Sequence, residues 1–208
     1  MSESPYTVSD VMTHTVVAVG RDASFKEIVG LIDQWKVSAL PVLEGEGRVV
    51  GVVSEADLLA KEGVKGGNEE ALDLAERAKA EALTAGELMS TPAVTVHADA
   101  SVAEAARIMA RRRVKRLPVV DAIGMLQGVV SRSDLLKVFL RPDEEIAGEI
   151  VSSVLTKLPV TTPLTVTVSD GVATLEGSAA ERTYMPIVAR AVRAVEGVVD
   201  VRLELTHR

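Results

Sequence analysis

Residues 49–59 read VVGVVSEADLL, and residues 126–136, which lie 77 positions further along the chain, read LQGVVSRSDLL. The same offset aligns residues 10–59 with residues 87–136 without a gap, and nineteen of the fifty aligned pairs are identical. Similarity at one fixed offset over this length indicates a duplicated structural unit. The sequence therefore predicts that most of the chain consists of two copies of one fold.

The two copies share a predicted order of elements. A short strand (residues 16–19 or 94–96) leads to a Ser that has Glu three residues later, a pair that caps the start of a helix. Two apolar strands joined by a glycine-containing turn follow, and a last helix begins after the Ser of the shared GVVS sequence. The expected fold class is α+β, with the order β-α-β-β-α in each copy.

Residues 61–84 join the two copies. They begin as a glycine-rich loop, and Asn68 can cap an Ala- and Glu-rich helix that runs to about Leu83. The charges of this helix are mixed and its apolar side is thin, which favours a solvated spacer over a helix that binds a partner.

The chain changes character after Pro142. Residues 143–158 have acidic side chains in the first turn and one apolar helical face, formed by Ile146, Ile150, Val154 and Leu158. Two alternating strands around Asp170-Gly171, a helix over about 181–195 and a strand over 198–205 follow. This α-β-β-α-β unit of about 65 residues is large enough for its own core. The predicted domains are residues 8–60, 85–140 and 143–208, with residues 61–84 as the linker.

Composition limits the function classes. The chain has no Cys, which excludes disulfides, thiolate metal sites and Cys nucleophiles. Its net charge of −7 argues against a general nucleic-acid or anionic-membrane binder. No apolar run reaches the roughly 18–20 residues of a spanning helix, and the first residues lack the basic and apolar segments of a secretory signal. We expect a cytoplasmic protein.

Enzymatic chemistry has little support in the sequence. The three histidines, His14, His97 and His207, show no metal-ligand spacing, and neither G-x-S-x-G nor G-x-x-x-x-G-K-[ST] occurs. We expect no catalytic residue, no metal site and no catalytic cofactor.

The repeated motifs resemble those of the cystathionine-β-synthase (CBS) domain, in the tandem arrangement called a Bateman module. The resemblance covers about residues 8–140 and rests on DVMT or ELMS, LPV and GVVSxxD in register in both copies. The last region resembles a BON domain through DGVATLEG and VEGVVDVRL. The first resemblance implies a regulatory protein that binds AMP, ADP, ATP or S-adenosylmethionine and pairs as a homodimer. The second implies attachment to a phospholipid membrane or a protein surface.

The GVVSxxD motif also has chemistry of its own. Its glycine, Gly51 or Gly128, lets a backbone approach closely. The Ser hydroxyl and the amides at a helix N-terminus favour an anion, and an Asp one turn later can accept hydrogen bonds from ribose hydroxyls. A second interpretation stays open, because S-x-x-D is itself a capping box that only starts a helix.

The family resemblance assigns roles to residues of this chain. Ribose falls to Asp57 and Asp134, and adenine lies between walls formed by Val17 and Ala39 or by Val94 and Leu117. Phosphate contact passes by the resemblance to Ser54 and Ser131, and by their positive charge to Arg132, Lys115 and Arg116. The second copy is richer in cations and the first carries Glu55 inside the motif, so anion binding favours the cations of the second copy.

Two charged regions permit more than one interpretation. The basic cluster at Arg107, Arg111–Arg113, Lys115 and Arg116 fits a ligand phosphate, a solvated helix end or nucleic acid, of which the last lacks interleaved aromatic residues. Residues 143–208 carry ten acidic and six basic side chains, a balance that repels anionic lipid. An interaction or dimerisation role is therefore favoured for the last domain.

Two functions follow from these observations. In the first, an adenosyl ligand enters the cleft between the repeats and biases the position of the BON-like domain or of a partner. In the second, the CBS pair is a ligand-independent dimerisation scaffold, and the BON-like domain attaches it to an envelope or a protein.

Overall fold

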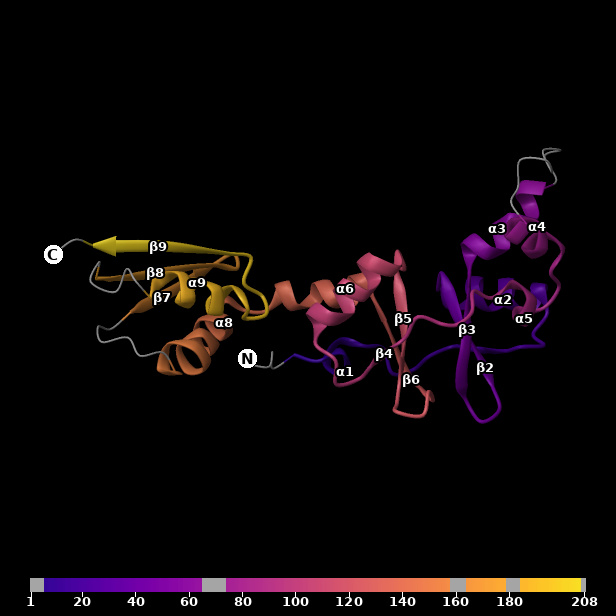
Figure 1. Ribbon diagram of the computed structural model, residues 1–208, viewed down its shortest axis with the longest axis horizontal. Coiled ribbons are helices and arrows are strands. Elements are labelled where there is room, and N and C mark those ends of the chain that lie inside the picture. The colour runs from indigo at the N-terminus through magenta and orange to yellow at the C-terminus, as the bar shows by residue number, and fades with distance from the viewer. Residues whose placement is uncertain (1–5, 65–73, 158–163, 179–183, 207–208) are drawn as a thin grey trace. The chain divides into compact units, whose positions relative to one another are not determined.

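The computed structural model describes residues 6–64, 74–157, 164–178 and 184–206 (Figure 1). The chain forms two compact units. One contains residues 8–132, and the other contains residues 133–208 together with the start of the chain up to Thr7. Each unit is described separately.

The first repeat is a three-stranded sheet with helices. Its elements are β1 (Val19–Gly20), α2 (Phe25–Trp35), β2 (Ala39–Glu44), β3 (Arg48–Ser54) and α3 (Glu55–Val64). The sheet order is β1-β2-β3, with β1 parallel and β3 antiparallel to β2. Ile28 of α2 and Leu40, Val42 and Val53 of the strands are fully buried in its core.

The second repeat has the same architecture. Its elements are β4 (Val96–His97), α6 (Val102–Arg112), β5 (Arg116–Val120) and β6 (Leu126–Ser131), with the sheet order β4-β5-β6, and its last helix, α7 (Arg132–Leu136), begins at the boundary between the two units. The strand pairing repeats in detail, since Val42 pairs with Gly51 and Val119 with Gly128, each beside a register shift. The predicted α+β class and the order β-α-β-β-α in both copies are confirmed.

Matching local signals start and stop the first helix of each repeat. Ser24 Oγ accepts a hydrogen bond from the backbone N–H of Glu27 at 3.3 Å, and Ser101 Oγ accepts one from Glu104 at 3.1 Å. Both helices end at a basic residue whose backbone is in the left-handed conformation, Lys36 with φ 51° and Arg113 with φ 55°. Because this conformation strains side chains other than glycine, the two equivalent positions are unusual.

The segments that start the two repeats are exchanged. α1 (Val8–Val11) precedes the first repeat but bonds to the second, where Val8 N–H donates to Ala100 O at 2.8 Å and Thr13 forms a bridge with Val129. α5 (Ala85–Leu88) precedes the second repeat but bonds to the first, where Ala85 N–H donates to Ala23 O at 2.9 Å (Figure 1). Each repeat therefore completes the other, and residues 8–132 fold as one unit.

This exchange accounts for the glycine of each GVVSxxD motif. A Cβ on Gly51 would clash with the Met89 side chain, and a Cβ on Gly128 would clash with Met12. The close approach at these glycines is thus made by a methionine of the exchanged segment. The expected close approach of a backbone is present at Gly128, where a Cβ would also lie 2.9 Å from the Thr13 carbonyl oxygen.

Gly128→Ala is expected to lower the free energy of unfolding by about 1–3 kcal/mol, because the new Cβ would lie 2.7 Å from Met12 Sδ and 2.9 Å from the Thr13 carbonyl oxygen. Gly30→Ala on α2 is the matched control, since nothing lies within 4 Å of the new Cβ. This substitution should raise the free energy of unfolding by about 0.5–1 kcal/mol. Urea unfolding monitored by circular dichroism measures both. Equal stabilities for the two variants would contradict the packing described.

The linker helix is less solvated than the sequence suggests. α4 spans Leu74–Glu81 and packs against α3. The predicted cap at Asn68 lies outside the described residues. Ala82 is buried in the core of the first repeat, and Lys79 reaches inward from α4, so a freely solvated spacer is the wrong interpretation of this segment.

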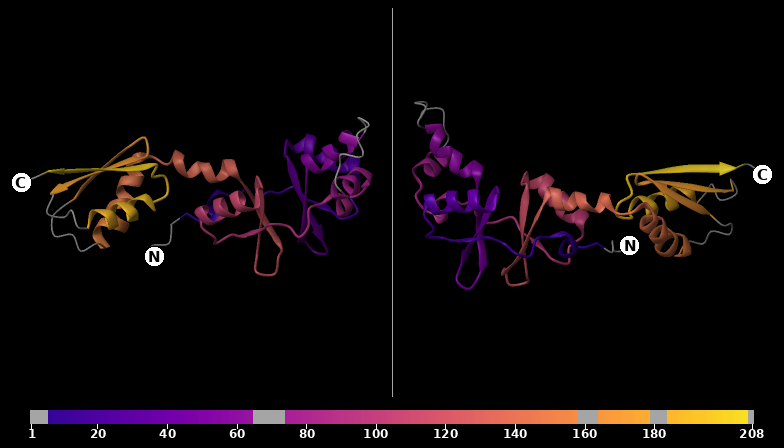
Figure 2. Two further views of the ribbon diagram at one scale, coloured as in Figure 1. Left: turned by 45° about the horizontal axis from the view of Figure 1, so that its top comes forward. Right: turned by 180° about the vertical axis from the view of Figure 1, so that it is seen from behind.

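The C-terminal unit contains the predicted α-β-β-α-β fold. Its elements are η2 (Lys137–Leu140), α8 (Asp143–Glu149), η3 (Ile150–Val154), η4 (Leu155–Lys157), β7 (Thr165–Ser169), β8 (Val172–Ser178), α9 (Met185–Arg193) and β9 (Asp200–Thr206). β8 is central, antiparallel to β7 and parallel to β9. α8 and α9 lie on one face of this sheet (Figure 2). No helix in the described ranges is long and apolar enough to cross a membrane.

The helix predicted over residues 143–158 changes its winding along its length. It is α-helical to Glu149, a π-helical turn from Ile150 to Val154, and 3-10 helical to Lys157. Its predicted apolar face is buried at Ile146, Ile150 and Val154, while Leu158 is outside the described residues.

The hairpin between β7 and β8 is the predicted turn at Asp170-Gly171. Both residues have positive φ, 50° and 72°, as a two-residue turn of this kind requires. The Asp143 carboxylate accepts hydrogen bonds from the backbone N–H groups of Asp170 at 2.8 Å and Gly171 at 2.9 Å. One side chain thus joins the start of α8 to the turn.

Candidate functional site

A cavity of about 300 Å³ lies within the unit of residues 8–132, and both repeats line it. The first repeat contributes the end of β3, the start of α3 and the start of β2, while the second contributes Val94 and the segment from Arg113 to Arg116. The volume is at the lower end of the range for sites that hold small molecules. The lining residues are Ser38, Ala39, Val52, Ser54, Glu55, Ala56, Asp57, Ser90, Pro92, Ala93, Val94, Arg113, Val114, Lys115 and Arg116.

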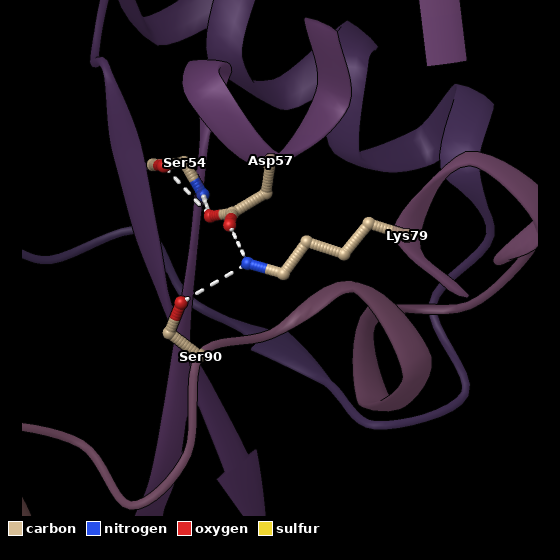
Figure 3. Close-up of polar contacts among 4 residues, drawn as sticks. All are labelled: Ser54, Asp57, Lys79 and Ser90. Carbon is tan, nitrogen blue, oxygen red and sulfur yellow. Dashed lines mark hydrogen bonds and ion pairs between the residues drawn. The ribbon is translucent and has the colours of Figure 1, made fainter. Parts of the chain in front are cut away.

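Asp57 is the buried carboxylate of this cavity, with 8% of its surface exposed. Its Oδ2 accepts hydrogen bonds from the Ser54 backbone N–H at 2.8 Å and from Ser54 Oγ at 2.7 Å. This contact caps α3, as the capping-box interpretation of S-x-x-D predicts, but it uses only one of the two carboxylate oxygens of Asp57. The other oxygen, Oδ1, is bound by the Lys79 ammonium (Figure 3).

Lys79 is a residue of the site that the sequence did not reveal. It extends from α4 to Asp57, and its Nζ also donates to Ser90 Oγ at 3.3 Å (Figure 3). The Lys79 side chain is 26% exposed and the Asp57 side chain 10%. The two residues are 22 positions apart on different helices, so no local motif pairs them.

Three cations of the second repeat line the cavity: Arg113, Lys115 and Arg116. Within the described part of the chain, none of the three forms an ion pair with a carboxylate. The carboxylates in the lining are Glu55, which is exposed, and Asp57, which Lys79 neutralises. The balance of charge in the cavity is therefore positive and favours an anion.

The predicted phosphate residues divide between two surroundings. Ser54, Lys115 and Arg116 line the cavity. Arg132 does not, because its guanidinium donates to the Val114 carbonyl oxygen at 3.1 Å. Ser131 pairs with Arg116 across β5 and β6 and is also outside the lining.

The predicted adenine walls divide in the same way. Ala39 and Val94 line the cavity, and both are half-buried. Val17 packs against the core of the first repeat. Leu117 is fully buried and cannot form a wall, because it is the counterpart of core residue Leu40 and not of Ala39.

Asp134, the second predicted ribose residue, lies on α7 and is not part of this cavity. Its Oδ1 accepts a hydrogen bond from Lys137 Nζ at 2.7 Å, one turn along the chain. Across the described ranges, no group of three His, Cys, Asp or Glu side chains is placed to hold a metal ion.

Sequence comparison assigns both repeats and the last domain to known families. The family described as CBS domain matches residues 8–62 and 85–141, and the family described as BON domain matches residues 142–207. The matches leave out the linker segment that contains α4.

Two similar proteins share the CBS part of this chain, and one of them has a crystal structure with a bound ligand. The chain is 29% identical over 157 residues to the CBS domain-containing protein CBSX2, chloroplastic, of Arabidopsis thaliana, a match that covers 67% of this chain and 66% of that protein. It is 29% identical over 155 residues to protein MJ1426 of Methanocaldococcus jannaschii, covering 64% of this chain and 90% of that protein. The crystal structure of CBSX2 in complex with AMP is 30% identical with a TM-score of 0.58, covering 65% of this chain and 97% of that one.

Proposed function

This chain belongs to the CBS domain family, as a tandem CBS pair followed by a BON domain, and we propose that it is a regulatory protein that binds an adenosyl ligand in the cavity between its repeats. One observation carries the proposal. A buried carboxylate, small apolar side chains and three cations without carboxylate partners among the described residues converge on one cavity, and each repeat supplies only part of the set. The complex of the similar protein CBSX2 with AMP supports this ligand class.

In the proposed binding mode, each part of the ligand meets matching chemistry. The ribose hydroxyls donate to the Asp57 carboxylate. The adenine ring lies against Ala39 and Val94, which offer apolar surface without aromatic stacking. The phosphates lie at the start of α3, next to Ser54, and against the cations of the second repeat.

The charge of the cavity discriminates among adenosyl ligands. AMP, ADP and ATP carry increasing negative charge, which Arg113, Lys115 and Arg116 attract. S-adenosylmethionine carries a positive sulfonium centre, and the same three side chains repel it. We therefore propose an adenine nucleotide as the regulatory ligand in preference to S-adenosylmethionine.

The proposed output is a relay to the BON domain. Continuity of the chain supports it, since β6 leads directly into α7, η2 and α8. A nucleotide can only bias that domain if it binds two arrangements of the protein with different affinity. Hydrogen exchange in α8 and β9 should therefore change on addition of ADP, and identical exchange with and without ADP would rule out a relay.

Thermal unfolding of the full chain with AMP, ADP, ATP and S-adenosylmethionine tests the binding function. A ligand at a hundredfold excess over its Kd adds about 2.7 kcal/mol to the free energy of unfolding. We expect upward shifts with the nucleotides. Unchanged melting with all four compounds would favour the alternative function, a ligand-independent homodimeric scaffold that attaches through its BON domain.

Arg113→Gly is expected to weaken ADP binding about tenfold without destabilising the protein. The substitution removes a cation from the cavity. Binding weakens because a charge-assisted hydrogen bond to the ligand contributes about 1.5–3 kcal/mol. It also relieves the left-handed conformation at φ 55°. Calorimetric titration with ADP measures the change in affinity.

Lys36→Gly is the matched control for this variant. Lys36 has φ 51° at the equivalent position of the first repeat, is exposed and does not line the cavity. It should keep the affinity of the wild type while sharing any gain in Tm. Equal ADP affinities in the two variants would show that Arg113 does not contact the ligand.

A further inference from the structure

We propose that Lys79 of the linker helix α4 exchanges Asp57 for the ligand's phosphates when a nucleotide binds, and so makes the site select charged over neutral adenosyl ligands. This inference rests on the proposed nucleotide binding at Asp57 and adds a residue, a selectivity and a link to the linker. Lys79 lies outside both matched CBS segments, and its ammonium binds the carboxylate that the ribose must reach.

The contacts of Asp57 leave little room for a shared arrangement. Ser54 donates twice to Oδ2, and Lys79 donates to Oδ1 (Figure 3). The Asp57 side chain is only 10% exposed. Of the roughly four acceptor sites of the carboxylate, Ser54 occupies two and Lys79 one, while the two vicinal hydroxyls of a ribose need two. The ribose therefore competes with the Lys79 ammonium for Oδ1.

A displaced Lys79 has a defined place to go. Its Nζ also donates to Ser90 Oγ at 3.3 Å, and Ser90 lines the cavity. A lysine has four carbons of flexible stem, so the ammonium can leave Asp57 while α4 stays in place. A phosphate gives it a new anionic partner, alongside Arg113, Lys115 and Arg116, whereas adenosine offers none.

The second repeat shows that this arrangement is not a general consequence of the fold. There the matching carboxylate, Asp134, is bound by Lys137 on the adjoining turn. The position equivalent to Lys137 in the first repeat is Ala60, and the cation comes instead from a separate helix. Occupancy of the first site is thereby connected to α4, which is absent from the repeated unit.

Lys79→Met tests the exchange, because Met keeps the length of the side chain without its charge. Calorimetric titrations of the full chain with adenosine and with ATP should change in opposite directions. We expect adenosine to bind about tenfold more tightly, since its competitor for Asp57 is gone, and ATP about tenfold more weakly, since a phosphate partner is gone. Lys79→Arg should keep the preference of the wild type for ATP.

Lys26→Met is the matched control, since Lys26 is exposed on α2 and outside the cavity. It should leave both affinities unchanged, and melting without ligand checks that Lys79→Met is folded. If wild type binds ATP and Lys79→Met tightens adenosine and ATP alike, Lys79 only blocks the site and the exchange is wrong. Unchanged or uniformly weakened binding in Lys79→Met also overturns it. Failure of wild type to bind either compound would instead reject the nucleotide site itself.

Discussion

Asp57→Asn is expected to weaken ADP binding about 100-fold, because the amide accepts hydrogen bonds with only one oxygen and carries no charge. The Asn oxygen can still accept from the Ser54 backbone N–H, the contact that now caps α3 at 2.8 Å. The variant should therefore stay folded and lose the ligand. Calorimetric titration with ADP gives the affinity, and melting without ligand reports the fold.

Asp134→Asn is the control for this substitution. It makes the same chemical change at the equivalent position of the second repeat, on a side chain that does not line the cavity. We expect ADP affinity close to that of the wild type. Loss of binding in Asp134→Asn with normal binding in Asp57→Asn would mean that the ligand occupies a different place from the one argued above.

Arg141→Met is expected to destabilise the C-terminal unit by about 3–5 kcal/mol, because it breaks a buried ion pair and leaves its partner unpaired. The Arg141 guanidinium donates to Glu149 Oε2 at 2.8 Å and to the Glu196 carbonyl oxygen at 2.6 Å, and it lies 4.6 Å from the centre of the Tyr6 ring. The Arg141 and Glu149 side chains are only 10% and 16% exposed. The single Trp, Trp35, lies in the first repeat, so tryptophan fluorescence does not report unfolding of the C-terminal unit. Hydrogen exchange in α8 and β9 is therefore the appropriate measurement.

Two further variants separate the buried pair from surface charge. Arg193→Met removes an exposed arginine that lies 3.7 Å from Asp200, with both side chains more than half exposed, and should cost less than about 1 kcal/mol. Combining Arg141→Met with Glu149→Leu should recover part of the loss, since no uncompensated carboxylate is then buried. Similar exchange rates in Arg141→Met and Arg193→Met would show that the buried pair contributes no more than the exposed one.

The fold was predictable because its signals are local and appear twice. Capping serines, strand alternation and turn glycines determine where elements begin and end without reference to distant residues. Their repetition at one offset made the two copies interpretable together. The hairpin at Asp170-Gly171 followed in the same way, since only residues that tolerate positive φ fit such a turn.

The exchange of α1 and α5 could not be predicted because it is a question of tertiary packing. A four-residue helix has no pattern that says which repeat it will contact. The repeated pairing of a Met and a motif Gly, Met12 with Gly128 and Met89 with Gly51, is the trace it leaves in the sequence. That trace has meaning only once the two partners are known to meet.

The site was predictable where it depends on the repeat and not where it depends on register or on the linker. Leu117 was matched with Ala39 although it is the counterpart of Leu40, and one step along a strand turns a side chain to the opposite face. Leu117 is accordingly fully buried, whereas Arg116, the counterpart of Ala39, lines the cavity. Lys79 belongs to neither repeat, so no comparison of the copies could have found it.

A crystal structure of the full chain with ADP would test the central claim most directly. We predict one nucleotide in the cavity between the repeats, with its ribose hydroxyls within about 3 Å of the Asp57 carboxylate and its phosphates against Arg113, Lys115 and Arg116. Nucleotide bound elsewhere, or a cavity that stays without nucleotide at saturating ADP, would contradict the claim.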